Sequence, residues 1–526
     1  MKNHWMSRTP HRGTSRRDFL SGIFTAAAAI SIAPRLGAFS SADPLSVAPD
    51  LAATLAADVL RPQYHLLPAA NWMNDPNGPI YWQDSYHMFF QYNPNAAVWG
   101  DMHWAHAVSP DMLHWKHLPV ALAPTPGSAD QDGCFSGSAV EDHGTAKFLY
   151  TGISSSTPEL ATLRNPGHNY REVVCLATSI DPDLRTLKKF VRPVLVPPAD
   201  PLIAGFRDPF VWKDGPFWFL GLGSGLRKQG GRVLLYRSRD LKHWDNAGVL
   251  ASGKWNGKDT PDVVDSGEMW ECPDFFPLGD KDVLIYSTER KVYWESGELD
   301  RKEMKFHSQK SGLLDSGAYY APKTQTAANG DRILWGWITE TRPEAEFSKA
   351  GWAGCMSLPR VLSMDSDGGL IMRPAPEIAK LRGKEFSLPI TTSAQRLKAL
   401  RGLRIENLAA EISLRVRPTP FSMNLTDGQQ KFLSLSFDPA NAGSELVVNG
   451  AAAALPIAGL TEITITLFID GSVMELFVNG HACRTIRVYQ IPAKSLSVDI
   501  AEAALPNMVS LQVWQMTPIS SDRLTT

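Results

Sequence analysis

The stretch NWMNDPNGP, at residues 71–79, is the first of five polar or small-residue motifs that recur along the chain. The motifs contain Asp75, Ser136, Asp208, Glu271 and Ala321, at intervals of 61, 72, 63 and 50 residues. Each interval is about the length that an elaborated four-stranded propeller blade needs. Five such units predict a five-bladed β-propeller, in which the equivalent strand of every blade lines one central funnel. Motifs that are far apart in the sequence would then meet in space.

The sequence around these motifs has the pattern of strands rather than of helices. Short apolar or alternating runs, such as residues 86–92 and 333–338, are separated by Gly, Pro, Asp and Asn. A second, weaker repeat has a similar length, because Ser-x-Asp turns begin at Ser109, Ser179 and Ser238. We therefore predict an all-β fold.

The strand pattern of the propeller breaks near Met372, where RPAP at 373–376 precedes a short helical piece. Residues 461–469 then alternate, and hairpin turns are predicted at Asp-Gly 470–471 and Asn-Gly 479–480. Successive hairpins predict a C-terminal β-sandwich. The predicted divisions are a signal peptide over 1–42, the propeller over 59–372, a linker over 373–384 and the sandwich over 385–518.

The N-terminal residues have the composition of an export signal. Basic residues up to Arg17 precede an apolar, alanine-rich run of 14 residues from Leu20 to Ala33, which is too short to span a bilayer comfortably. SRRDFL at 15–20 resembles the twin-arginine signal, whose substrates cross the membrane already folded. We expect export to the periplasm or beyond, without membrane insertion after signal removal. A general secretory signal or a retained anchor is the alternative.

Composition excludes several classes of partner. Lys and Arg number 52 and Asp and Glu 54, for a net charge of -2, so no excess positive field would attract a nucleic acid. The five cysteines are widely spread and could form at most two pairs. Neither they nor the 13 histidines show the spacing of a zinc site, and we expect no metal and no cofactor. The sequence leaves the oligomeric state open.

Three carboxylates would meet at the mouth of the predicted funnel: Asp75 in NDPNG, Asp208 in FRDP and Glu271 in WECPD. One such Asp often only accepts backbone hydrogen bonds in a turn. Three carboxylates in apolar strands are costly to bury unless they have a partner or a purpose. Glycoside hydrolysis requires two carboxylates in opposite protonation states. Arg207, beside Asp208, could keep that third carboxylate ionised.

Seven stretches in the same order resemble glycoside hydrolase family 32, the invertases, levanases and exo-inulinases. They are WMNDPNG (72–78), FSGSAV (135–140), FRDP (206–209), EC (271–272), YAPKT (320–324), WGW (335–337) and GWAGCMSLPR (351–360). The resemblance extends from about Tyr64 to the end of the chain and includes VMELFVNG at 473–480.

The resemblance implies a role for each matched residue. Asp75 is similar to the nucleophile, Glu271 to the acid/base and Asp208 to the transition-state stabiliser. The substrate-binding residues implied are Trp72, Asn74, Gln91, Trp99, Phe135, Ser136, Arg207 and Asp315. Phe135 stands where plant members often carry Trp, and Ala318 where some plant invertases have Lys. These departures leave the substrate preference open.

The resulting prediction is a retaining, exo-acting β-fructosidase that removes terminal β-D-fructofuranosyl residues from sucrose or from fructans such as levan and inulin. Exo-action is expected because Trp72 and Trp99 could wall the pocket around one fructosyl unit. Two alternatives stay open: a fructosyltransferase that uses the same site, and a non-catalytic fructan-binding propeller. A five-bladed arabinan-type hydrolase would not be expected to carry all three acidic motifs.

Overall fold

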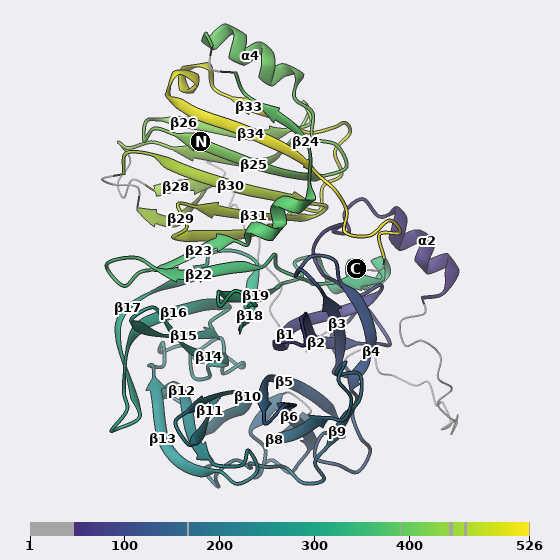
Figure 1. The fold of residues 1–526 in the computed structure, drawn as a ribbon, viewed down its shortest axis with the longest axis vertical. Coiled ribbons are helices and arrows are strands. Elements are labelled where there is room, and N and C mark those ends of the chain that lie inside the picture. Colours follow the sequence, from purple (N-terminus) through teal and green to yellow (C-terminus); the bar gives the residue numbers. More distant parts are fainter. Residues whose placement is uncertain (1–46, 166–167, 390, 441–444, 457–459, 525–526) are drawn as a thin grey trace, which may run out of the picture.

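The structure is a computed structural model that describes residues 47–165, 168–389, 391–440, 445–456 and 460–524. The predicted signal peptide, residues 1–42, lies outside the described residues. Figure 1 shows a ring of small sheets with a layered pair of sheets stacked against one side of it. The fold is a five-bladed β-propeller followed by a β-sandwich, as predicted.

Five antiparallel sheets form the blades of the propeller, in chain order. The first blade consists of β1 (Asn71–Trp82), β2 (Ser85–Asn93), β3 (His103–Ser109) and β4 (Lys116–Leu122). The second consists of β5 (Gly133–Asp142), β6 (Thr145–Ser155), β8 (His168–Ser179) and β7 (Leu163–Asn165), and β9 (Leu187–Lys189) pairs with β8. The third consists of β10 (Ile203–Asp214), β11 (Phe217–Leu226), β12 (Gly230–Ser238) and β13 (Asp245–Ser252).

The last two blades complete the ring and connect it to its beginning. The fourth consists of β14 (Glu271–Leu278), β15 (Lys281–Thr288), β16 (Lys291–Asp300) and β17 (Lys305–Asp315). The fifth consists of β18 (Tyr319–Thr326), β19 (Arg332–Ile338), β22 (Arg360–Met364) and β23 (Leu370–Pro374), and β21 (Cys355–Met356) pairs with β19. Between β19 and β21 in the chain, β20 (Trp352–Ala353) leaves the fifth blade and pairs in parallel with β1. The chain of the fifth blade thus adds a strand to the sheet of the first blade and closes the ring.

Each of the five sequence motifs is a β-bulge on the first strand of its blade. The pairing register shifts between Met73 and Pro76 in β1, between Phe135 and Gly137 in β5, and between Arg207 and Phe210 in β10. The same shift occurs after Glu271 in β14 and after Tyr320 in β18. A bulge inserts an extra residue and re-aims the side chains beside it. The recurring polar motifs therefore mark the points where each first strand turns its side chains toward the funnel.

The C-terminal sandwich consists of two antiparallel sheets. One has the order β24 (Arg382–Ser387), β34 (Met508–Met516), β25 (Ala409–Val416), β30 (Ile463–Asp470), β31 (Val473–Val478) and β32 (Ala482–Arg487). The other has the order β29 (Ala451–Pro456), β28 (Glu445–Val448), β27 (Lys431–Phe437), β26 (Phe421–Thr426) and β33 (Ser497–Ile500). Their facing apolar side chains form one buried core, distinct from that of the propeller.

Short helices lie outside these sheets: α2 (Pro49–Ala57), α3 (Glu344–Ala350), α4 (Ser393–Gly402) and the 3₁₀ turns Pro376–Leu381 and Glu502–Asn507. No helix within the described residues is long and apolar enough to cross a membrane. All five cysteines are buried and unpaired, although the sequence allowed two disulfides.

A fully buried ion network joins the two domains. His65, before the first blade, contacts Asp470 through Nδ1 at 2.8 Å and Glu475 through Nε2 at 3.0 Å, and both carboxylates belong to the sandwich. The guanidinium of Arg360, in the fifth blade, contacts Glu475 at 2.6 Å and Asp315 at 2.9 Å. A buried charge is costly without a partner, so each of these groups depends on the others across the domain boundary.

Candidate active site

The bulges of three blades bring three carboxylates into one cavity at the centre of the propeller, the inner cavity. Asp75, Asp208 and Glu271 come from β1, β10 and β14, and all are buried. The thiol of Cys272 lies 3.4 Å from Asp75 Oδ2 and 3.5 Å from Asp208 Oδ2. One small side chain therefore reaches both aspartates. The three acidic motifs, separated by up to 196 residues, meet as predicted.

Both oxygens of Asp75 accept hydrogen bonds. Ser136 Oγ donates to Oδ2 at 2.7 Å, and Asn74 Nδ2 donates to Oδ1 at 3.0 Å. Gln91 links these two donors, because its Nε2 donates to Ser136 Oγ and its Oε1 accepts from Asn74, both at 2.9 Å. Trp72 Nε1 donates to Asn74 Oδ1 at 2.8 Å. This network fixes the orientation of the Asp75 carboxylate within the cavity.

Glu271 has a cation on one oxygen and a phenol on the other. Arg207 donates to Oε1 from Nε at 3.3 Å and from Nη2 at 3.0 Å. Tyr320 OH donates to Oε2 at 2.8 Å. The remaining guanidinium nitrogen of Arg207, Nη1, donates to Glu172 at 2.8 Å. Tyr320 begins the YAPKT motif, and Glu172 lies in a strand without a recognisable motif, so neither residue was predicted from the sequence to belong to the site.

Asp208 differs from the expectation that Arg207 would keep it ionised. Arg207 directs its hydrogen bonds to Glu172 and Glu271, and its Nε lies 3.9 Å from Asp208 Oδ2. Burial raises the pKa of Asp208 to about 6, with the charges of Glu271 and Asp75 adding to the rise and Arg207 opposing it. The backbone N–H of Cys272 donates to Asp208 Oδ2 at 2.8 Å. Asp208 is thus held in place mainly by a backbone donor.

The predicted substrate-binding residues fall into five positions. Gln91, Phe135, Ser136 and Arg207 line the inner cavity, and Trp99 lines both this cavity and an outer one. Trp72 lines only the outer cavity, and Asn74 is fully buried beside Asp75 and lines neither of them. Asp315 lines neither cavity and belongs to the interdomain network instead.

The prediction that Asp315 contacts substrate is not supported by its position. Its carboxylate accepts from Arg360 Nη2 at 2.9 Å, from Thr485 Oγ1 at 2.7 Å and from the backbone N–H of Thr485 at 2.9 Å. Both Asp315 and Arg360 are completely buried. The physical reason is that a buried guanidinium needs a carboxylate, and Asp315, at the end of β17, supplies one.

A second, outer cavity adjoins the inner one at Glu271. The two cavities share Trp99, Asp262, Val264 and Glu271, and their volumes are about 180 Å³ for the outer and 60 Å³ for the inner. Aromatic side chains line much of the outer cavity: Trp72, Trp99, Tyr319, Tyr320, Trp337 and Phe347. Glu271 therefore lies between a small polar compartment and a larger aromatic one.

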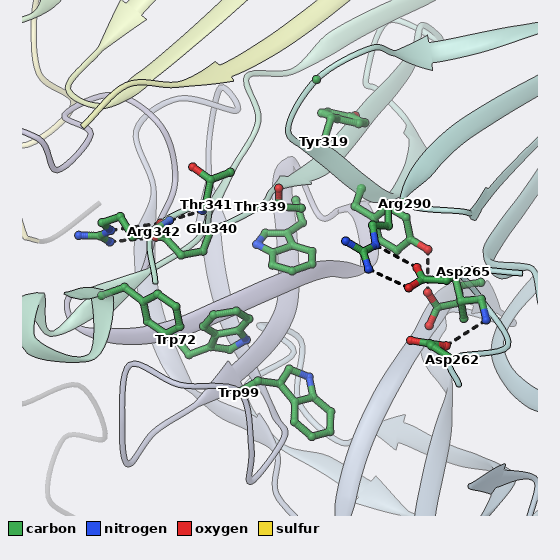
Figure 2. Close-up of a pocket in the computed structure, with 16 residues that line it drawn as sticks. Trp72, Trp99, Asp262, Asp265, Arg290, Tyr319, Thr339, Glu340, Thr341 and Arg342 are labelled. Carbon is green, nitrogen blue, oxygen red and sulfur yellow. Dashed lines mark hydrogen bonds and ion pairs between the residues drawn. The ribbon is translucent and has the colours of Figure 1, made fainter. Parts of the chain in front are cut away.

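The rim of the outer cavity is charged. Figure 2 shows Asp262, Asp265 and Arg290 on one side, with Glu340 and Arg342 on the other. Each arginine binds a carboxylate through two nitrogens: Arg290 to Asp265 at 3.0 and 2.8 Å, and Arg342 to Glu340 at 3.1 and 2.8 Å. Burial and the charge of Glu271 raise the pKa of Asp262. The rim thus carries more carboxylates than guanidinium groups.

A cluster of carboxylates at the axis of a five-bladed propeller, with an aromatic compartment beside it, defines this protein as a β-propeller glycoside hydrolase. Comparison with known families gives the particular one. The model of the glycosyl hydrolases family 32 N-terminal domain matches residues 65–374, and that of the family 32 C-terminal region matches residues 377–515. The chain belongs to glycosyl hydrolase family 32.

Individual relatives match most of this chain. A sucrose-6-phosphate hydrolase from Escherichia coli is 35% identical over 471 residues, which cover 82% of this chain and 90% of the relative. A family 32 β-fructofuranosidase variant from Bombyx mori, solved with sucrose, is 29% identical with a TM-score of 0.72, over 89% of this chain and 97% of that one. Fructan 1-exohydrolase IIa from Cichorium intybus is 26% identical with a TM-score of 0.69, over 88% and 98%.

Proposed function

We propose that the protein is a retaining, exo-acting β-fructosidase that releases terminal β-D-fructofuranosyl units from sucrose or fructans. The position of Glu271 between the two cavities is the observation that carries the proposal. A fructosyl unit in the inner cavity would present its anomeric carbon to Asp75 and its leaving oxygen to Glu271. The rest of the substrate would lie in the outer cavity, against its aromatic side chains.

The first step of the proposed reaction forms a covalent intermediate. A carboxylate oxygen of Asp75 attacks the anomeric carbon, and the bond from that carbon to the leaving oxygen breaks with its electron pair. Glu271 transfers its proton to the leaving oxygen, so the sugar or shortened chain departs as a neutral alcohol. Asp208, held by the backbone of Cys272, accepts hydrogen bonds from fructosyl hydroxyls.

The second step returns both carboxylates to their initial states. Glu271, now ionised, takes a proton from a water molecule whose oxygen attacks the anomeric carbon. The ester bond to Asp75 breaks and its electron pair returns to the carboxylate. Two displacements at one carbon give net retention of configuration. An inverted first product in a rapid NMR measurement would contradict this mechanism.

The size and lining of the inner cavity support exo-action. The inner cavity is small, and Phe135, Leu163 and Trp99 line it. In the proposed binding mode these side chains would limit it to one terminal fructosyl unit and exclude a continuing chain. The similarity of this chain to the fructan 1-exohydrolase of Cichorium intybus, over most of the length of that protein, also supports exo-action. We expect fructose as the only early product from inulin or levan. Early release of oligofructosides would contradict exo-action.

Product analysis on sucrose, inulin and levan tests the whole proposal. Free fructose and, from sucrose, equal amounts of glucose are expected for a hydrolase. Kestose-type oligosaccharides as the main products from sucrose would identify a fructosyltransferase instead. Binding of a fructan without turnover by the correctly folded protein would identify a non-catalytic binding propeller.

We also propose export by the twin-arginine route, supported by the similarity of SRRDFL at 15–20 to that signal. Replacing Arg16 and Arg17 together by Lys should leave the precursor in the cytoplasm. Fractionation of cells that express both forms would measure this. Unchanged export of the Lys variant would favour the general secretory route.

A further inference from the structure

Glu172 is a buried carboxylate that lines neither the inner nor the outer cavity. It lies on β8 in the second blade with 0% of its surface exposed. Its Oε1 accepts from Arg207 Nη1 and its Oε2 from the backbone N–H of Phe206, both at 2.8 Å. Burying a carboxylate costs free energy that these partners offset. Glu172 is thus connected to Glu271 through the guanidinium of Arg207.

The guanidinium nitrogens of Arg207 donate hydrogen bonds to two carboxylates, those of Glu172 and Glu271. Nη1 faces Glu172, whereas Nε and Nη2 face Oε1 of Glu271 at 3.3 and 3.0 Å. Among the described residues that line the inner cavity, Arg207 is the only cation. The outer cavity adds Arg290 and Arg342, which bind Asp265 and Glu340. Arg207 therefore supplies a guanidinium in direct contact with Glu271, and Glu172 contacts the other end of that guanidinium.

This arrangement addresses a conflict in the proposed reaction. Glu271 must hold a proton before the first step, but a guanidinium and the Tyr320 hydroxyl on its oxygens both favour the carboxylate. Asp208, Asp75 and Asp262 act in the opposite direction, because neighbouring negative charges favour the protonated acid. Glu172 adds one more negative charge, placed directly on the cation that opposes protonation.

We propose that Glu172 is a positioning residue that, through Arg207, sets the pH at which Glu271 gives up its proton. The proposal rests on the proposed role of Glu271 as the acid. With Glu172 ionised, part of the charge of Arg207 is neutralised and Glu271 keeps its proton to higher pH. Without that charge, Arg207 stabilises the Glu271 carboxylate more strongly, and the acid is lost at lower pH.

The pH profile of kcat/KM on sucrose tests this role. In Glu172→Gln, which removes the charge at nearly constant shape, the alkaline limb should move to lower pH by about one pH unit. Activity on the acid side of the optimum should stay close to that of the wild type. Glu172→Asp keeps the charge and should keep the alkaline limb at its wild-type position. A role that is only structural would lower activity equally at every pH.

A matched control is the Asp130→Asn variant. Asp130 is also buried beside the second blade and also pairs with a cation, Lys189, but it lines neither cavity. Its removal should leave the alkaline limb unchanged. A shift as large as that of Glu172→Gln would overturn the proposal, because loss of any buried charge would then be sufficient.

If Glu172→Gln leaves too little folded protein, the double variant Glu172→Gln/Arg207→Gln removes the unpaired cation as well. Its alkaline limb should lie at or above that of the wild type, because neither charge then acts on Glu271. A limb below the wild type, or an unshifted limb in folded Glu172→Gln, overturns the inference. Failure of the wild type to release fructose at any pH would instead refute the proposed function.

Discussion

At the scale of single residues, the three carboxylates occupy different surroundings within one cavity. Asp75 accepts hydrogen bonds from two neutral side chains, Glu271 contacts a guanidinium and a phenol, and Asp208 accepts from a backbone N–H. Sequence could predict that these three meet, because their motifs recur at blade-length intervals. It could not predict the surroundings, because Glu172 and Tyr320 approach from blades whose contacts depend on the closed ring.

The neutral network around Asp75 gives a direct test of its role. Asp75→Asn keeps the size of the side chain and removes the nucleophile, so turnover of sucrose should fall by on the order of 10⁴-fold or more. Thermal melting should show a folded protein. Asp84→Asn, in the exposed turn between β1 and β2, is the control and should keep normal activity. Normal turnover in folded Asp75→Asn would remove Asp75 from the mechanism.

The surroundings of Asp208 predict an acidic limit to activity. Because burial raises its pKa to about 6, Asp208 takes up a proton as the pH falls through that value, well above the ordinary range of an aspartate. Protonation removes its negative charge, so Asp208 accepts hydrogen bonds from fructosyl hydroxyls more weakly. We expect kcat/KM on sucrose to fall below pH about 6. A profile that stays flat down to the ordinary aspartate range would contradict this assignment.

At the scale of elements, the β-bulges on the first strands of the blades direct the site side chains toward the funnel. The spacing of the motifs predicted five repeats, but a period in sequence does not reveal a shift in pairing register. Asp315 illustrates the limit. It matches a family position at the end of a blade strand, yet its side chain turns toward Thr485 and Arg360 of neighbouring elements. Only the packed domains determine that direction.

The segment between β13 and β14 supplies Asp262 and Asp265 to the rim of the outer cavity. With Arg290 bound to Asp265 and Arg342 to Glu340, this rim leaves little net positive charge for a phosphate group. We expect kcat/KM for sucrose to exceed that for sucrose 6-phosphate by roughly tenfold or more, since like charges at a binding site are costly.

The Asp262→Asn variant tests the cause of that selectivity. Removing this charge should raise the relative rate on sucrose 6-phosphate severalfold and change the rate on sucrose less. The exposed Asp245→Asn, in β13 away from both cavities, is the control. A wild-type preference for the phosphorylated sugar would contradict the electrostatic argument.

At the scale of the whole molecule, the interdomain network predicts how stability depends on pH. Burial alone would lower the pKa of His65, but hydrogen bonds and charges from Asp470 and Glu475 outweigh it and raise the pKa to about 9. The stabilisation is therefore complete below the unfolded value of 6.5 and is lost as the pH rises through about 9. It amounts to a few kcal/mol.

Thermal melting across this pH range checks the prediction. The midpoint of the wild type should fall as the pH rises toward 9, whereas His65→Gln should be less stable at neutral pH and lose less on alkalinisation. His143→Gln, at an exposed turn, should follow the wild type. Parallel melting curves for His65→Gln and the wild type would show that His65 carries no charge in the folded protein.

The contact between Arg360 and Tyr319 gives the sandwich a part in shaping the site. Arg360 binds Glu475 of the sandwich, and its guanidinium lies 4.2 Å from the ring centroid of Tyr319, which lines the outer cavity. Truncation after the fifth blade would strip Arg360 of Glu475 and Thr485 and open this wall to solvent. A gene shortened to encode the propeller alone should therefore give a less active protein. A chimera that carries the sandwich of a homologue would also need a carboxylate in place of Glu475 to pair with Arg360.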